Sequence, residues 1–174
     1  IILILFIYSS SFLRADDIGK FSITRIQYRG GGDWYSDQSS IPNLLNFINM
    51  NTDVPVDIIE KKSKIGDDIF IQSPYLYLTG HGNIKFSEEE AIILRNHLLS
   101  GAFLHADDNY GMDKSFRREM EKVFPDKDWV ELSPDHNIFH SYYQFNNGLP
   151  KIHEHDNKRP QALALFDEER MIAL

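Results

Sequence analysis

The fold is decided by residues 74–110, which read PYLYLTGHGNIKFSEEEAIILRNHLLSGAFLHADDNY. Residues 74–79 form an apolar run that is typical of a central strand covered on both faces. Residues 87–99 have the pattern of an amphipathic helix, and residues 102–106 form a second buried strand. Two strands joined by one helix run parallel, so their carboxyl ends meet at the same edge of a sheet.

Both strands end in residues that can do chemistry. Gly80-His81-Gly82 follows the first strand, and Asp107-Asp108 follows the second. In open α/β sheets, ligands bind beyond the carboxyl ends of the strands. The sequence therefore predicts a functional site at this edge.

The helix between the two strands carries clear end signals. Ser87 and Glu90 form a capping box, in which each side chain bonds the backbone N–H of the other. Gly101 occupies the position where a helix commonly ends in a left-handed conformation.

The same kinds of pattern predict the rest of a single α/β domain over residues 20–174. In chain order, the predicted elements are a strand at 21–28, a helix with Ser40 as N-cap, a poorer strand at 54–65, a helix that ends at Pro125, a short strand at 129–132, and a hairpin of 162–166 and 171–174. Alternation of strands and helices indicates a flavodoxin-like open sheet, mostly parallel, with helices on both faces and strand order 2-1-3-4-5.

Composition excludes several classes of function. The net charge is −8 at pH 7 and the basic residues are scattered, which argues against a nucleic-acid partner. The chain has no cysteine, so disulfides, thiolate nucleophiles and cysteine zinc sites are excluded. It also lacks a G-x-S-x-G serine elbow and a phosphate-binding P-loop.

Residues 1–15 differ in kind from the rest of the chain. An apolar run is followed by serines and Ala15, which is the pattern of the end of a secretory signal peptide. A hydrophobic N-terminal strand is the alternative, and the run is too short to span a bilayer. We expect an exported protein, periplasmic or associated with the cell envelope. The apolar end at Leu174 leads us to expect a truncated C-terminus.

The three glycines at 30–32 form the first of the candidate site segments. Gly31, Gly32, Asp33, Trp34 and Tyr35 follow the first predicted strand. Consecutive glycines let a backbone approach a ligand closely, or they simply make a turn with positive φ. In the predicted strand order, this segment lies beside the ends of strands three and four.

His81 is the candidate general acid–base residue. Its flanking glycines, Gly80 and Gly82, expose the ring, and Asp107 or Asp108 would supply the orienting carboxylate. The alternative is a histidine that only bonds a loop. Because successive residues of a strand point to opposite faces, one aspartate should face the crevice and the other should cap the following loop.

A second, weaker candidate site is a metal centre. His153, His155 and Asp156 offer two imidazoles and a carboxylate, for which zinc is the obvious ion. A polar loop that happens to carry histidines is the alternative, and no cofactor is otherwise expected.

Several motifs in this order resemble the bacterial domain-of-unknown-function family 4159. They are RIQY at 25–28, GGDWY at 31–35, LYLTGHG at 76–82, ADDNYG at 106–111, FRREM at 116–120 and LPKIH at 149–153. The family is grouped with class I glutamine amidotransferase-like folds, and it has no established activity. The resemblance implies membrane proteins of a MoxR-type gene neighbourhood as partners. The cysteine used in glutamine hydrolysis is missing here.

Two functions follow from these observations. The first is a non-catalytic domain that holds a small ligand or a protein partner, with Trp34, Tyr35 and Tyr110 suited to a sugar or a peptide. The second is a hydrolase or lyase that uses His81 with Asp107 or Asp108, with or without a metal ion.

Overall fold

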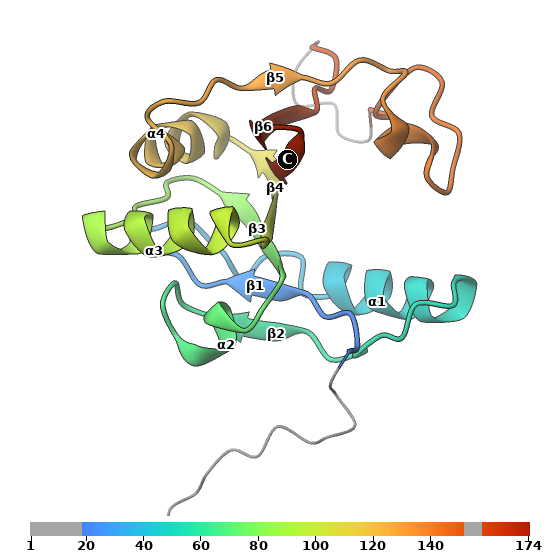
Figure 1. Ribbon diagram of the computed structural model, residues 1–174, viewed down its shortest axis with the longest axis horizontal. Helices are drawn as coiled ribbons and strands as arrows, with labels where there is room; N and C mark the ends of the chain where they lie inside the picture. Colours follow the sequence, from blue (N-terminus) through green and yellow to red (C-terminus); the bar gives the residue numbers. More distant parts are fainter. Residues whose placement is uncertain (1–18, 152–157) are drawn as a thin grey trace, which may run out of the picture.

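The computed structural model describes residues 19–151 and 158–174 (Figure 1). Its seven strands are β1 (Thr24–Ile26), β2 (Lys61–Ser63), β3 (Tyr75–His81), β4 (Phe103–Tyr110), β5 (Val130–Glu131), β6 (Leu163–Asp167) and β7 (Arg170–Ala173). Its helices are α1 (Ser40–Asn51), α2 (Asp68–Ile71), α3 (Glu88–Leu99), α4 (Asp113–Val123) and the 3₁₀ turn η2 (Asn137–His140).

The strands form one open, mixed sheet in the order β2-β1-β3-β4-β7-β6-β5. The pairs from β2 to β7 are parallel, and only β6 runs against its neighbours. The predicted α/β class and the order 2-1-3-4 are confirmed.

The fifth position of the sheet was predicted wrongly. It is taken by β7 and not by the next strand in the chain, because β6 and β7 form the predicted hairpin, which brings β7 back beside β4. Two backbone hydrogen bonds hold it there: Leu174 N–H to the Leu104 carbonyl at 2.9 Å, and Ala106 N–H to the Leu174 carbonyl at 2.8 Å. The strand β5 pairs only with β6 and so lies at the outer edge.

Helices cover both faces of the sheet, as predicted (Figure 1). On one face, Ile41 and Leu45 of α1 pack with Ile23 and Tyr77. On the other face, α2, α3 and α4 contribute buried side chains to a larger core that includes Phe70, Leu94 and Met120. The central strands are therefore buried on both sides, and only their ends are open to ligands.

The predicted ends of α3 are confirmed. Glu90 N–H donates to Ser87 Oγ at 3.1 Å, and Ser87 N–H donates to Glu90 Oε2 at 2.6 Å. At the other end, Gly101 has φ +119° and donates its N–H to the Leu98 carbonyl. The left-handed glycine stops the helix and turns the chain into β4.

Several predicted boundaries were wrong. Ser40 is the first residue of α1 and not its N-cap, and its hydroxyl donates to the Asp37 carbonyl at 2.8 Å. The strand predicted at 54–65 is only three residues long, and the strand predicted at 21–28 is equally short. By contrast, the strand predicted to end at residue 106 continues to Tyr110, because it stays paired with the end of β3.

Some predictions fall outside the described residues. These are the signal peptide at 1–15 and the metal ligands His153, His155 and Asp156. Among the residues that are described, none of the helices has the length and apolar character needed to cross a membrane.

Candidate site at the carboxyl edge of the sheet

The glycines at 30–32 let two backbones pack closely. Gly32 N–H donates to the Asn83 carbonyl at 2.9 Å, and Lys85 N–H donates to the Arg29 carbonyl at 2.7 Å. A Cβ on Gly32 would lie 2.7 Å from the His81 carbonyl oxygen, and one on Gly30 would lie 2.8 Å from that of Asn83. Both predicted roles apply: Gly30 and Gly31 have positive φ, and the glycines allow a close approach, although what approaches is the loop after β3.

Arg25 holds the part of the loop after β1 that follows Asp33. Its side chain is 1% exposed and donates to the carbonyls of Ser36 at 2.7 Å, Asp37 at 3.2 Å and Trp34 at 3.3 Å. Glu60 pairs with its Nε at 2.5 Å, which balances the buried charge. The segment that carries Asp33 is therefore held at both ends.

Asp33 and His81 meet through two contacts. Asp33 Oδ1 accepts the backbone N–H of His81 at 2.5 Å, and Oδ2 lies 3.1 Å from the ring Nδ1. The pKa of Asp33 lies below its usual value. The hydrogen bond from the His81 backbone N–H has the largest effect and lowers it, burial opposes this, and the contact with the His81 ring lowers it further. The carboxylate that orients His81 thus comes from Asp33, in place of the expected Asp107 or Asp108.

Gly80 makes the Asp33–His81 contact sterically feasible. Its φ is +137°, and a Cβ there would collide with Tyr28 Oη and lie 2.9 Å from Asp33 Oδ1. Tyr28 donates its hydroxyl to the Thr79 carbonyl at 3.1 Å. Burial and then the charges of Asp33 and Asp108 raise the pKa of Tyr28 to about 12, so it remains a neutral donor.

Asp107 and Asp108 have separate tasks. Asp107 Oδ2 accepts the hydroxyl of Tyr77 at 3.1 Å, on the face of the sheet that α1 covers. Asp108 accepts the backbone N–H groups of Met112 at 2.9 Å and Asp113 at 3.1 Å, at the start of α4. One aspartate caps the following loop, as expected from the alternation of side chains along a strand.

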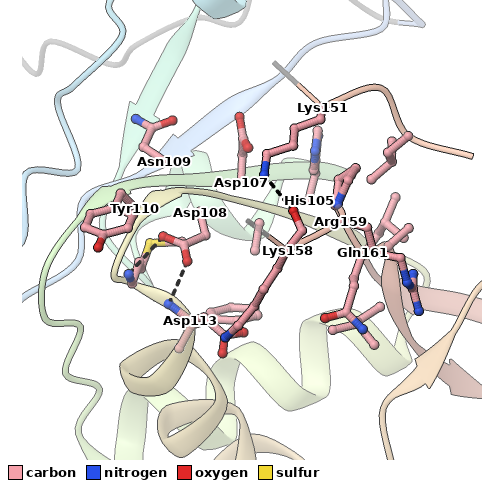
Figure 2. Close-up of a pocket in the computed structure, with 18 of the residues that line it drawn as sticks. His105, Asp107, Asp108, Asn109, Tyr110, Asp113, Lys151, Lys158, Arg159 and Gln161 are labelled. Carbon is pink, nitrogen blue, oxygen red and sulfur yellow. Dashed lines mark hydrogen bonds between the residues drawn. The ribbon is translucent and has the colours of Figure 1, made fainter. Parts of the chain in front are cut away.

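A cavity of about 660 Å³ lies beyond the end of β4 (Figure 2). Asp107, Asp108 and Tyr110 line it from β4, and Lys151, Lys158, Arg159 and Gln161 line it from the loop before β6. Aromatic side chains complete it, contributed by Phe116, Trp129 and Phe145. Ligand cavities in proteins are typically of this size and similarly mixed in lining.

His105 forms part of the same cavity. Its Nδ1 lies 3.1 Å from the Tyr75 hydroxyl, and burial lowers the pKa of the ring despite the charge of Asp107. The ring is therefore neutral at physiological pH. Burial and Asp107 also raise the pKa of the neighbouring Tyr77 to about 12.

The structure does not place all the predicted site residues in one cavity: Asp107, Asp108 and Tyr110 line it, whereas residues 31–35 and 80–82 do not. The Asp33–His81 pair adjoins the cavity where His81 pairs with Tyr110 across β3 and β4. Trp34 packs on the core and contacts the exposed ring of Tyr35 edge-on, with 5.6 Å between ring centroids. In residues 19–151 and 158–174, no group of three metal-ligating side chains is present.

Two features of the site were missed in the sequence. Asp33 was predicted only as a ligand-binding residue, although its place directly after three glycines was a signal that its loop reaches another strand end. The basic side chains of Lys151, Lys158 and Arg159 carried no such signal, since they lie in polar segments far along the chain from β4.

The fold and site define an α/β domain with a cavity of mixed polar and apolar lining beyond the carboxyl end of β4. Residues 22–174 match the family described as Domain of unknown function (DUF4159), so the chain belongs to this family, and the resemblance in its motifs is confirmed. No curated protein matches the chain. The grouping with amidotransferase-like folds stays a prediction.

Proposed function

We propose that this domain binds a small zwitterionic ligand of the peptide class in the cavity beyond β4. The observation that carries the proposal is the distribution of charge around that cavity. Acidic side chains border it from β4, and basic side chains border it from the loop before β6. A ligand with an ammonium group and a carboxylate complements such a pair of walls.

Several contacts favour a preorganised cavity. Arg159 Nη2 bonds Glu131 Oε2 at 3.0 Å, and Arg117 Nε bonds Asp113 Oδ1 at 2.6 Å. The Arg117 guanidinium also lies 5.5 Å from the centre of the Trp129 ring. Side chains held in this way lose little conformational entropy when a ligand arrives. The aromatic rings supply apolar contact for a hydrophobic side chain of the ligand.

The proposal assigns binding and no thiol chemistry, because the chain has no cysteine. We also propose that the domain acts outside the cytoplasm, on the basis of residues 1–15. From that side of the membrane, the domain could contact a membrane protein partner of the kind that the family resemblance implies.

Ligand-observed NMR tests the proposal with the dipeptide alanylphenylalanine as the probe. We expect binding, and at least about tenfold weaker binding of the same dipeptide with its amine acetylated and its carboxylate amidated. Maltose, which is neutral, should bind weakly or not at all. If maltose binds and the dipeptide does not, the cavity is a sugar site and the proposal is wrong.

Matched variants locate the binding. Asp107→Asn and Arg159→Gln should each weaken the dipeptide at least about tenfold, since each removes one charge from the cavity wall. Asp53→Asn and Arg95→Gln are the controls, because Asp53 is exposed and Arg95 pairs with Asp126 outside the cavity. Equal effects in both sets would contradict binding in the cavity.

A further inference from the structure

We propose that His81 is a general base for hydrolysis of small carboxylic esters, with Asp33 as its positioning residue and water as the nucleophile. This inference goes beyond ligand binding in the cavity. It rests on the double contact of one carboxylate with one histidine, and on the position of that histidine beside the cavity.

The Asp33 carboxylate fixes the proton on a particular ring nitrogen. Oδ2 lies 3.1 Å from Nδ1, and Asp33 is ionised at neutral pH because its pKa is lowered. An ionised carboxylate only accepts hydrogen bonds, so Nδ1 must be the donor. In the neutral ring, Nε2 then carries the lone pair that a general base needs.

The ring is held in place but remains accessible. The backbone N–H of His81 is bound by Asp33 Oδ1, and Asp33 N–H is in turn bound by the His81 carbonyl at 3.3 Å. The His81 side chain is nevertheless 52% exposed. A group that is fixed at its backbone and open at its reactive atom is suited to proton transfer.

The neighbouring residues connect His81 to the cavity. His81 pairs with Tyr110 on β4, and Tyr110 lines the cavity. Neighbouring strands lie about 4.8 Å apart, so His81 is one strand away from the cavity wall, and we infer that an ester extending past Tyr110 reaches its ring. Other titratable groups also lie close: the Tyr28 hydroxyl lies beside Gly80 and senses the charge of Asp108, and Arg118 bonds Asn83 Oδ1 at 3.0 Å.

The reaction that fits these groups is direct hydrolysis. His81 Nε2 accepts a proton from water while the water oxygen adds to the acyl carbon, and the carbonyl electron pair moves to its oxygen. When that pair returns, the bond to the alkoxide oxygen breaks, and the departing alkoxide takes the proton from Nε2 and leaves as the alcohol. One water is consumed, and the ring ends neutral. An alcohol leaves more readily than an amine, so esters and not amides are the substrate class.

The sharpest variant is Asp33→Asn. Its amide oxygen can still accept the backbone N–H of His81, which leaves the amide nitrogen facing Nδ1. That nitrogen is a donor, so it forces the ring proton onto Nε2 and removes the base. The variant keeps the loop geometry and reverses the tautomer of the His81 ring. If Asp33 had a purely structural role, this change would leave the rate of hydrolysis unaltered.

The test measures hydrolysis of p-nitrophenyl acetate and the tautomer of His81 by nitrogen NMR of the ring. The wild-type protein should hydrolyse the ester faster than buffer, and His81→Gln and Asp33→Asn should each lose at least about tenfold, since general bases contribute about 10²–10⁴. Asp33→Asn should also move the proton from Nδ1 to Nε2. His136→Gln and Asp53→Asn, which lie away from the pair, should keep the wild-type rate.

Each contrary result overturns the inference. A wild-type rate equal to that of buffer, an unchanged rate in either site variant, or an equal loss in the controls would do so. A wild-type ring protonated at Nε2 would also contradict it. Dipeptide binding in the cavity should persist in both site variants, so failure of the ester test leaves the proposed binding function to be judged separately.

Discussion

Asp33 Oδ1 accepts the backbone N–H of His81, and Asp33 Oδ2 contacts the His81 ring. The two residues are 48 positions apart in the chain, and this contact joins the loop after β1 to the end of β3. The contact between Asp33 and His81 depends on Gly80, which lies directly before His81 and leaves room for the Asp33 carboxylate and the Tyr28 hydroxyl.

Gly80→Ala should therefore destabilise the protein. A side chain at φ +137° is strained, and the added Cβ collides with Tyr28 Oη. We expect backbone strain alone to lower the free energy of unfolding by about 1–3 kcal/mol, and the collision to lower it further. Gly111→Ala is the control, because Gly111 also has positive φ but no atom within 4 Å of the added Cβ. Urea denaturation measures both, and equal losses would show that the collision is relieved.

Glu119→Gln should destabilise the protein by about 1–3 kcal/mol. The Glu119 side chain is 2% exposed and accepts from the backbone N–H of Phe86 at 2.8 Å, from Lys122 at 2.7 Å and from Arg118 at 2.8 Å. Glu121→Gln, on the exposed side of the same helix, should change the stability little.

The stabilisation by Glu119 should also depend on pH. Burial alone would raise the pKa of Glu119, but Lys122, the Phe86 N–H and Arg118 together lower it below 4.5. A lowered folded-state pKa gives a stabilisation that is complete above about 4.5 and is lost as the pH falls through the folded value. The wild-type protein should therefore lose stability in acid more steeply than Glu119→Gln, and parallel curves would contradict this.

Asp108→Ala should lower the free energy of unfolding by about 0.5–2 kcal/mol, because Asp108 accepts backbone N–H groups at the start of α4. Asp107→Asn should cost less, since an amide can still accept the Tyr77 hydroxyl. Thermal unfolding of the two variants separates the stabilising aspartate from the one that we propose for ligand binding. A larger loss for Asp107→Asn would reverse this assignment.

Residues 1–15 should direct export when they are expressed with an added initiating Met in front of the chain. In signal peptides, the apolar segment is the part that the export machinery recognises. Here it corresponds to the apolar run in residues 1–15, and we expect cleavage near Ala15. A reporter that is active only in the periplasm measures this, with a fusion that lacks residues 1–15 as the control. Uncleaved protein retained in the cytoplasm would contradict the prediction.

The sequence was most informative where local patterns decide structure. The run at 74–79, the capping box of Ser87 and Glu90, and Gly101 each act within a few residues, and all three are confirmed. The polar residues at the end of β4 were not predicted as strand, because their pairing with β3 is a tertiary contact that no alternation of side chains signals.

Long-range relations in the site were beyond such patterns. Nothing local indicates that the carboxylate facing His81 comes from Asp33, or that β7 separates β4 from β6. Both follow from how distant segments pack against one another. The general position of the site was nevertheless predictable, because parallel strands must end at a common edge.

The most direct test of the proposed function is a map of backbone amide shifts by two-dimensional NMR as alanylphenylalanine is added. Binding in the cavity predicts shifts concentrated in residues 105–113 and 158–163, which border it, and their loss in Asp107→Asn but not in Asp53→Asn. Shifts confined to other parts of the protein, or none at millimolar dipeptide, would contradict the account.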